Sequence, residues 1–277
     1  MIYLNCEIKS GLGEDTFWTW FHREFPNSSY EIPKVLKDND IVLRYSTLGF
    51  LPIEGKQMAL CWELYPRMKE TFNSNQWDNI LDKVYECARY STYRSVATID
   101  TVDDYSKYGH VDVLPIGVDI NIFKPLNDKK TLREKYDIPL DKKVGIWIGT
   151  THPMKGFTKL MEYAAKNPDI YWILVWKWEK EALNIDNCKT FVQISQTQIN
   201  ELLNASDFFL STSQLRPYYM AEWEAMASNI PFVFYGNVER EFIPSDNPRN
   251  DVLKFGWDRE TVKEKWIRFF EENGIEW

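Results

Sequence analysis

Short apolar runs alternate with longer helical stretches along the C-terminal half of the chain, and this pattern limits the possible folds most strongly. The apolar runs that read as buried strands are residues 143–149, 169–176, 190–194, 207–210 and 231–235. The stretches that read as helices are residues 157–167, 196–205 and 221–228. Strands that alternate with helices at this spacing predict a parallel sheet with helices on both faces.

The N-terminal half shows the same alternation less regularly. Its expected strands are residues 1–8, 41–45, 57–62 and 95–99, and its expected helices are residues 15–25 and 79–90. A polar segment at residues 126–130 reads as a linker, so we place the domain boundary there. The sequence therefore predicts two Rossmann-like α/β domains, over residues 1–125 and 126–258, with a ligand cleft between them.

A final helix is expected within residues 259–277, because Val262, Trp266, Phe269 and Phe270 recur at helical spacing. We expect this helix to cross back and pack on the N-terminal domain. Aromatic residues make up 16% of the chain, and most of them are expected to fill the cores. The alternative is that some of them line a groove and stack against sugar rings.

Charge and composition exclude several classes of protein. The net charge of −8, from 41 acidic and 33 basic residues, argues against a broad nucleic-acid surface. No apolar stretch approaches the roughly 20 residues of a membrane span, and the first residues lack the features of a signal peptide. The cysteines and histidines show no metal-ligand spacing. We therefore expect a cytoplasmic protein without a metal, and contact with a membrane surface stays open.

Four segments in the C-terminal two thirds form a recognisable series. They are residues 114–125 (LPIGVDINIFKP), Gly149 followed by Lys155-Gly156, residues 202–213 (LLNASDFFLSTS), and Glu224-Ala225-Met226-Ala227 with Ile230-Pro231. In this order and at these separations they resemble the retaining glycosyltransferases of the two-Rossmann (GT-B) type, the group 1 or family 4-like enzymes. That family includes sucrose synthases and bacterial mannosyl- and glucosyltransferases. The N-terminal half resembles the family only loosely.

The resemblance implies a specific reaction. A sugar would pass from a nucleotide-diphosphate donor, a UDP- or GDP-sugar, to a hydroxyl group of a glycan, lipid-linked or protein acceptor. The anomeric configuration would be retained, the departing phosphate oxygen would take the acceptor proton, and no cofactor or metal would be required. The donor would bind the C-terminal domain, in the cleft between the two domains.

Lys155 is the strongest single candidate residue. It follows a strand that ends at Gly149, and Gly156 permits close backbone approach before a helix whose N-terminus favours anions. The resemblance implies that Lys155 binds the donor diphosphate, where a fixed ammonium stabilises the charge that develops on the leaving phosphate. The alternative is a solvated surface lysine.

Glu224 and the loop before it are further donor-site candidates. The resemblance implies that Glu224 accepts hydrogen bonds from the ribose, and the alternative is an acid that complements its own helix N-terminus. Residues 216–221, with Tyr219, Met220 and Ala221, would direct backbone N–H groups at the diphosphate. Ile194, at the end of a predicted strand, completes the donor-binding set.

Two residues of this region depart from the family pattern. Arg216 stands eight residues before Glu224, where the family commonly has a glutamate, and an arginine cannot accept hydrogen bonds from sugar hydroxyls. Thr150 stands where the family has an arginine. Our hypothesis is that Arg216 grips the diphosphate and supplies the cation that Thr150 does not.

Candidates in the N-terminal half are weaker. Gly11 and Gly13 resemble the glycine-rich loop of the family, although a simple tight turn has the same pattern. Trp62 replaces the family histidine that touches the donor sugar, and Glu63 next to it could orient an acceptor hydroxyl or be a solvated loop carboxylate. Residues 38–40 (DND) have the D-x-D pattern of metal-dependent glycosyltransferases, but they precede a strand and read as a turn.

Three other functions stay open from the sequence. The first is a glycosyltransferase of phage or virus type that acts on DNA bases, which the acidic composition argues against. The second is a non-catalytic module that binds a sugar or a nucleotide with the same fold. The third is a phosphorylase or epimerase of the same architecture.

Overall fold

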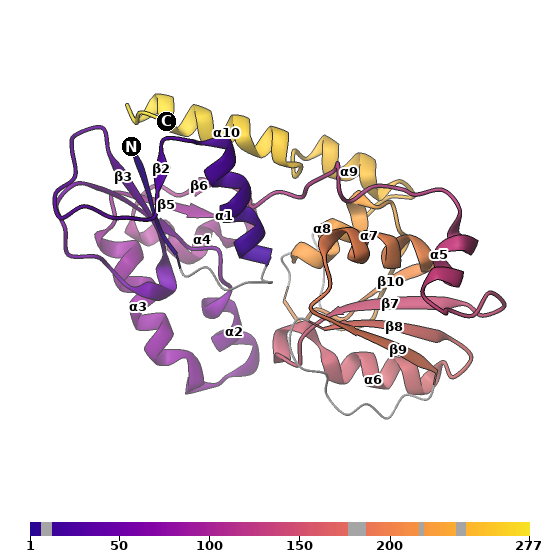
Figure 1. The fold of residues 1–277 in the computed structure, drawn as a ribbon. Coiled ribbons are helices and arrows are strands. Elements are labelled where there is room, and N and C mark those ends of the chain that lie inside the picture. Colours follow the sequence, from indigo (N-terminus) through magenta and orange to yellow (C-terminus); the bar gives the residue numbers. More distant parts are fainter. Residues whose placement is uncertain (7–12, 177–186, 216–218, 237–241) are drawn as a thin grey trace. The chain divides into compact units, whose positions relative to one another are not determined.

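The computed structural model describes residues 1–6, 13–176, 187–215, 219–236 and 242–277. The chain divides into two compact units (Figure 1). Unit 1 comprises Met1–Gly117 together with Glu260–Trp277, and unit 2 comprises Val118–Arg259. Each unit contains its own parallel sheet, which confirms the predicted α/β class with two Rossmann-like domains.

Unit 1 is built on a parallel sheet with the strand order β2-β1-β3-β4-β5-β6. Its strands are β1 (Ile2–Asn5), β2 (Ser28–Ser29), β3 (Ile41–Tyr45), β4 (Lys56–Leu60), β5 (Tyr93–Val96) and β6 (Asp112–Val113). Its helices are α1 (Gly13–Glu24), α2 (Tyr65–Phe72), α3 (Asp78–Tyr90), α4 (Val102–Tyr105) and α10 (Arg259–Glu272). Every residue of β3 is buried, as expected for a central strand covered on both faces.

The core of unit 1 is dominated by aromatic side chains from α1 and α10. Helix α10, yellow in Figure 1, runs beside α1, and the ring of Trp266 packs edge-on against Phe21 at a centroid distance of 5.2 Å. The aromatic residues buried in this core are Phe17, Trp18, Trp20, Phe21, Phe25, Tyr45, Trp62, Trp266, Phe269 and Phe270. These rings therefore serve packing, and the apolar stripe of α10 is what attaches the end of the chain to unit 1.

Unit 2 has a parallel sheet with the order β11-β10-β7-β8-β9. Its strands are β7 (Val144–Gly149), β8 (Tyr171–Trp176), β9 (Cys188–Val192), β10 (Phe208–Ser211) and β11 (Phe232–Phe234). Its helices are α5 (Lys129–Lys135), α6 (Phe157–Lys166), α7 (Gln196–Ala205), α8 (Met220–Ala227) and α9 (Pro248–Lys254). β7 and β8 are nearly continuous apolar runs, which suits strands that are covered on both faces.

The division between the units falls at Gly117, and the segment that reads as a linker belongs to unit 2. It is bonded within unit 2: the N–H of Leu126 donates to Asn204 Oδ1 at 2.7 Å. Asp128 caps α5, accepting from the N–H of Thr131 at 3.0 Å. Upstream, the N–H of Val118 donates to the carbonyl of Trp257 at 2.8 Å. The polar composition of residues 126–130 therefore does not by itself identify a linker between the units.

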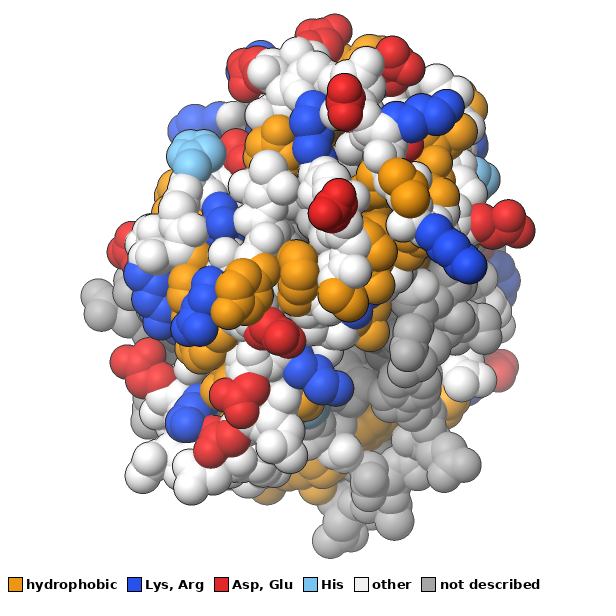
Figure 2. All heavy atoms as spheres, turned by 90° about the vertical axis from the view of Figure 1, so that its left-hand side faces the viewer, with side chains coloured by type: hydrophobic (Ala, Val, Ile, Leu, Met, Phe, Trp, Pro, Cys, Tyr) orange, Lys and Arg blue, Asp and Glu red, His pale blue; other side chains and the backbone are white. Residues whose placement is uncertain are grey.

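Charged side chains of both signs are interspersed with apolar ones on the face that unit 1 presents in Figure 2. Such mixing differs from the single-sign patch of a nucleic-acid surface. Asp40 of the D-x-D pattern is buried, and its carboxylate accepts from the N–H of Lys37 at 2.9 Å, which closes a turn. Within the described ranges, no helix is both long enough and apolar enough to cross a bilayer.

Candidate functional site

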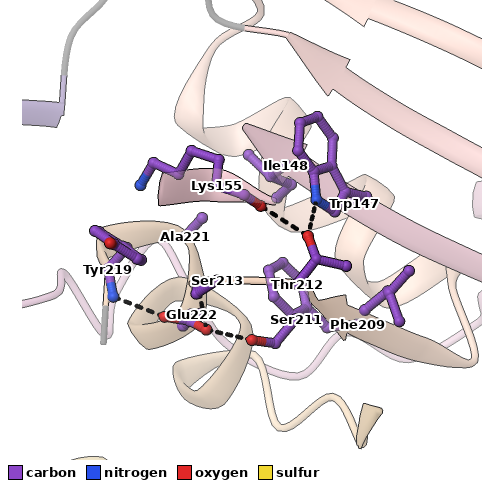
Figure 3. Close-up of a pocket in the computed structure, with 11 residues that line it drawn as sticks. Trp147, Ile148, Lys155, Phe209, Ser211, Thr212, Ser213, Tyr219, Ala221 and Glu222 are labelled. Carbon is purple, nitrogen blue, oxygen red and sulfur yellow. Dashed lines mark hydrogen bonds between the residues drawn. The ribbon is translucent and has the colours of Figure 1, made fainter. Parts of the chain in front are cut away.

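The strand order of unit 2 changes direction between β7 and β10. β8 and β9 extend the sheet on one side of β7, and β11 extends it beyond β10 on the other. In open parallel sheets, ligands bind outside the carboxyl ends of the strands at such a switch point. A pocket enclosing about 240 Å³, including its solvent-open mouth, lies there (Figure 3). It is lined by Trp147, Ile148, Lys155, Phe209, Leu210, Ser211, Thr212, Ser213, Tyr219, Ala221 and Glu222.

Two predicted glycines allow the loop after β7 to reach the end of β10. Gly156 has φ +67°, and a Cβ atom built on it would lie 1.8 Å from the carbonyl oxygen of Thr212. A Cβ atom on Gly149 would lie 2.7 Å from the ring of Trp147. Between them, a short 3-10 turn (Pro153–Lys155) places Lys155 directly before α6. The glycines are therefore required because the backbone passes too close to its neighbours for any side chain.

Lys155 reaches into the pocket, as the sequence predicts for a donor-binding lysine. Its ammonium nitrogen lies 3.5 Å from the ring centroid of Tyr219, another predicted donor-site residue. An ammonium over the face of an aromatic ring is attracted by the ring quadrupole. The two residues come from different loops, so this contact joins the end of the β7 loop to the start of α8.

Glu222 is a pocket residue that the sequence analysis did not identify. It is 2% exposed, and its carboxylate accepts from the N–H of Tyr219 at 2.8 Å and from the hydroxyls of Ser211 at 2.5 Å and Ser213 at 3.2 Å (Figure 3). It lies in the first turn of α8, where an acid complements the helix dipole and caps free N–H groups. An acidic residue in the first turn of a predicted helix was the sequence signal that could have identified Glu222.

The Tyr219 N–H is therefore arranged differently from the expectation for a phosphate-binding loop. The sequence predicts that it points at a diphosphate, whereas in the structure it donates to Glu222. Ala221 does line the pocket, and Met220 begins α8. Arg216 lies outside the described residues, so its predicted contact with the diphosphate stays a prediction.

The remaining predicted donor-site residues of unit 2 lie beside the pocket lining. Glu224 is 7% exposed and two residues beyond Glu222 on α8. The hydroxyl of Thr150 accepts from the N–H of His152 at 3.3 Å, and Ile194 follows β9 and is half-buried. The described residues that line the pocket do not include Glu224, Thr150 or Ile194. Their donor contacts stay predictions.

His152 lies just before Lys155 in the same loop. Its Nδ1 accepts from the N–H of Met154 at 3.4 Å, so the ring caps the short turn that carries the lysine. Burial, and then the positive charge of Lys155, lowers the pKa of His152 below its ordinary 6.5. The neutral ring is thus the form that suits this position.

The predicted residues of unit 1 fall in three different settings. Gly13 begins α1, and Gly11 lies outside the described residues. Trp62 is 8% exposed and packs edge-on against Phe17 at 5.0 Å, so the residue in place of the family histidine is part of the core. Glu63 is half-buried between β4 and α2. Burial chiefly, and the charge of Glu63 among others, raises the pKa of the Cys61 thiol well above its usual range.

A buried arginine at the switch point of unit 1 also escaped the sequence analysis. Arg44, the penultimate residue of β3, pairs with Asn5 of β1, where the strand order of that sheet reverses. Its guanidinium donates to Asn5 Oδ1 and to the carbonyl of Leu48, each at 2.6 Å, and to the carbonyl of Gly49. The two carbonyl acceptors, Leu48 and Gly49, show that Arg44 holds the loop after β3, while Asn5 ties it to β1.

Across the described ranges, no three His, Cys, Asp or Glu side chains are grouped closely enough to hold a metal ion. The polar side chains that line the pocket of unit 2 include one lysine, two serines, a threonine, a tyrosine and a glutamate. A lysine in a pocket at the ends of parallel strands suits an anionic ligand such as a phosphate group.

Comparison with known proteins agrees with this geometry. Residues 128–239 match the family model described as glycosyl transferases group 1. No curated protein sequence matches the chain significantly. HepE of Anabaena, solved in complex with UDP-glucose, superimposes with a TM-score of 0.65 and 15% identity over 99% of this chain and 95% of its own.

Two further solved structures share the fold. WaaG, a glycosyltransferase involved in lipopolysaccharide biosynthesis, has a TM-score of 0.64 and 14% identity, with 99% of this chain and 94% of WaaG covered. Sucrose-phosphate synthase from Thermosynechococcus elongatus has a TM-score of 0.57 and 14% identity, with 94% and 75% covered. Together they confirm a resemblance to the GT-B glycosyltransferases: the chain has the GT-B fold, and its residues 128–239 match the glycosyl transferases group 1 family model.

Proposed function

We propose that the chain transfers a sugar from a nucleotide-diphosphate donor to a hydroxyl acceptor. The observation that carries this proposal is the ammonium group of Lys155 in a pocket at the β7–β10 switch point. When the bond between the anomeric carbon and the phosphate oxygen breaks, negative charge grows on the leaving phosphate. A fixed cation at that place lowers the barrier by about 3 kcal/mol, by analogy with a single oxyanion-hole donor.

The donor in this proposal is a UDP-sugar in the first instance and a GDP-sugar in the second. The UDP-glucose bound by HepE supports UDP as the first choice. The diphosphate lies against Lys155, Glu224 accepts from the ribose hydroxyls, and Arg216 supplies a second cation. Gly149, Thr150, Ile194, Met220 and Ala221 surround the donor in this arrangement.

The proposed reaction retains the anomeric configuration and needs no metal. The acceptor oxygen forms a bond to the anomeric carbon on the face from which the diphosphate leaves. The departing phosphate oxygen takes the acceptor proton, so that atoms and charge balance without a protein base. Glu63 orients the acceptor hydroxyl in this scheme. The acceptor is a glycan, a lipid-linked sugar or a protein, and the protein acts in the cytoplasm or at a membrane surface.

A calorimetric titration tests the donor site directly. Purified protein is titrated with UDP, GDP, ADP and their common sugar conjugates, and so are the variants Lys155→Ala and Lys159→Ala. Lys159 is a matched control because its ammonium already pairs with Glu162 on α6 at 3.0 Å. The proposal expects micromolar binding of one nucleotide that is strongly weakened in the first variant and kept in the second. Absence of binding by every nucleotide would overturn it.

One observation favours a second candidate function, a non-catalytic module that binds the same ligand. The carboxylate of Glu222 takes up the Tyr219 N–H that a phosphate-binding loop would offer, which weakens the anion site. The two functions differ in turnover. Slow hydrolysis of the donor by the wild type, abolished in Lys155→Ala, supports the enzyme. Tight binding with no hydrolysis, and no transfer to oligosaccharide or lipid-linked acceptors, supports the module.

A further inference from the structure

Two buried side chains connect the interior of unit 2 to the backbone of Lys155. The indole Nε1–H of Trp147 on β7 donates to the hydroxyl oxygen of Thr212 at 2.9 Å. That hydroxyl in turn donates to the carbonyl oxygen of Lys155 at 2.7 Å (Figure 3). Trp147 and Thr212 are each 2% exposed; the bond between them is buried, and the bond from Thr212 to Lys155 is partly buried.

The direction of these bonds shows what Thr212 can do. A hydroxyl group has a single hydrogen, and Thr212 gives it to the carbonyl of Lys155. Thr212 therefore has no donor left for a phosphate group, although it lines the pocket. Its contribution to ligand binding has to act through the backbone of Lys155.

A second set of bonds holds the same loop on the other side of its lysine. The backbone N–H of Gln214 donates to the carbonyl of Met154 at 2.8 Å, and the Gln214 side chain donates to the carbonyl of Thr212 at 2.7 Å. Gly156 then passes so close to that Thr212 carbonyl that a side chain would not fit. The loop is thus fixed to the end of β10 at the residue before Lys155, at Lys155 and at the residue after it.

We infer that Thr212 is a positioning residue for Lys155, with Trp147 fixing the direction of the Thr212 hydroxyl. The inference rests on the proposed function, in which Lys155 binds the donor diphosphate. The lysine side chain is long and flexible, so the position of its ammonium depends on a fixed backbone origin. Loss of the Thr212 hydroxyl frees that origin, and the lysine then spends less time where the diphosphate binds.

The test compares a substitution that keeps the shape of the Thr212 side chain with one that keeps its hydroxyl. Thr212→Val removes the hydroxyl, and Thr212→Ser keeps it. We expect Thr212→Val to weaken UDP binding about 5- to 10-fold, the value of one hydrogen bond, while Thr212→Ser stays within about twofold of wild type. Binding of uridine, which lacks the diphosphate, is expected to change less than about twofold in either variant.

A double-mutant cycle separates positioning from general damage. In a Lys155→Ala background, Thr212→Val should cause no further loss of UDP affinity, because its effect passes through the lysine. Equal losses of UDP and uridine binding would overturn the inference. The inference would also be overturned if Thr212→Val reduced UDP affinity as much in the Lys155→Ala background as in the wild type.

A second measurement does not depend on any donor. Lys155 in the ligand-free protein is labelled with an amine-reactive acylating reagent, and its labelling rate is followed by mass spectrometry. We expect several-fold faster labelling in Thr212→Val than in wild type or Thr212→Ser, and equal rates would overturn the inference.

If Thr212→Val does not fold, the double variant Trp147→Phe/Thr212→Val replaces it. This variant removes both hydrogen bonds, from Trp147 to Thr212 and from Thr212 to Lys155, without leaving a buried indole N–H unpaired. If the wild type binds none of the nucleotides, the proposed function fails, while the labelling still decides the role of Thr212.

Discussion

The ammonium nitrogen of Lys155 lies 3.5 Å from the ring centroid of Tyr219, which brings together two loops of unit 2 that are far apart in sequence. Tyr219 precedes the helix whose first turn carries Glu222. The pocket thus combines a positive side chain, an aromatic face and a buried carboxylate within one small volume.

Replacement of Lys155 is expected to reduce catalysis strongly. Lys155→Ala removes the cation that stabilises the leaving diphosphate, so we expect kcat/KM for the donor to fall about 100-fold or more. Release of the nucleoside diphosphate at low donor concentration measures this loss. Lys159→Ala is the control and should keep nearly full activity, since that lysine pairs with Glu162. A modest loss in Lys155→Ala, equal to that of the control, would remove Lys155 from the mechanism.

His152 is expected to make the protein less stable in mild acid. Its folded-state pKa is lowered below 6.5, so the folded protein favours the neutral ring, while the unfolded chain takes up a proton more readily. The stabilisation is therefore complete above about pH 6.5 and is lost as the pH falls through the lower folded-state pKa. Thermal unfolding of wild type and His152→Gln between pH 7.5 and pH 5 measures this contribution, and the variant should show the smaller decrease.

The same histidine reports on its neighbour. Because the charge of Lys155 contributes to the lowered pKa of His152, Lys155→Ala should shift that pKa back toward 6.5. The imidazole proton signals in an NMR titration give the value directly. The shift should be partial, since burial is the larger cause. An unchanged pKa would mean that the two side chains do not interact in solution.

Gly156 is expected to tolerate no side chain. Gly156→Ala places a Cβ atom 1.8 Å from the Thr212 carbonyl oxygen and forces alanine into a left-handed conformation with φ +67°. The left-handed conformation alone costs about 1–2 kcal/mol, and the clash adds to it. Gly274→Ala is the matched control, because Gly274 has φ +62° with no atom within 4 Å of the added Cβ. Urea unfolding should show a clearly larger loss for Gly156→Ala, and equal losses would contradict the close approach.

Trp266 is expected to be essential to unit 1. Trp266→Ala removes a fully buried ring that packs against Phe21 and Trp62, and such substitutions cost about 3–5 kcal/mol. Trp277→Ala, at a 39% exposed tryptophan in the same segment, should cost far less. Equilibrium unfolding followed by circular dichroism measures both. Similar midpoints for the two variants would show that α10 contributes little to the core.

Much of the fold follows from the sequence because its signals are local. The apolar run at β7 and the helical spacing of Val262, Trp266 and Phe269 each report directly on burial. Lys155 could be identified as a candidate from the sequence for a similar reason, since Gly149 and Gly156 on either side of it mark an unusual backbone path. These patterns depend on residues within a few positions of one another.

The missed features depend on distant partners. Residues 126–130 read as a polar linker, yet α5 begins at Lys129, and its Arg133 is 6% exposed and donates to the carbonyl of Ala205 at 2.9 Å and to Asp207 at 2.8 Å. Glu222 was not identified from the sequence, and its burial follows from its bonds to the serines at and just after the end of β10. A charged side chain shows its burial through its hydrogen-bond partners, and a single sequence does not identify those partners.

Unit 1 is assembled from two segments of the chain, and this has a consequence during synthesis. Lys263 of α10 pairs with Glu24 of α1 at 2.8 Å, although 239 residues separate them. On the ribosome, the aromatic face of α1 emerges long before the helix that covers it, whereas unit 2 is continuous and can fold as it emerges. The nascent N-terminal segment therefore keeps an exposed aromatic surface until the whole of unit 2 has been translated, and chaperones that bind such surfaces have that interval in which to act.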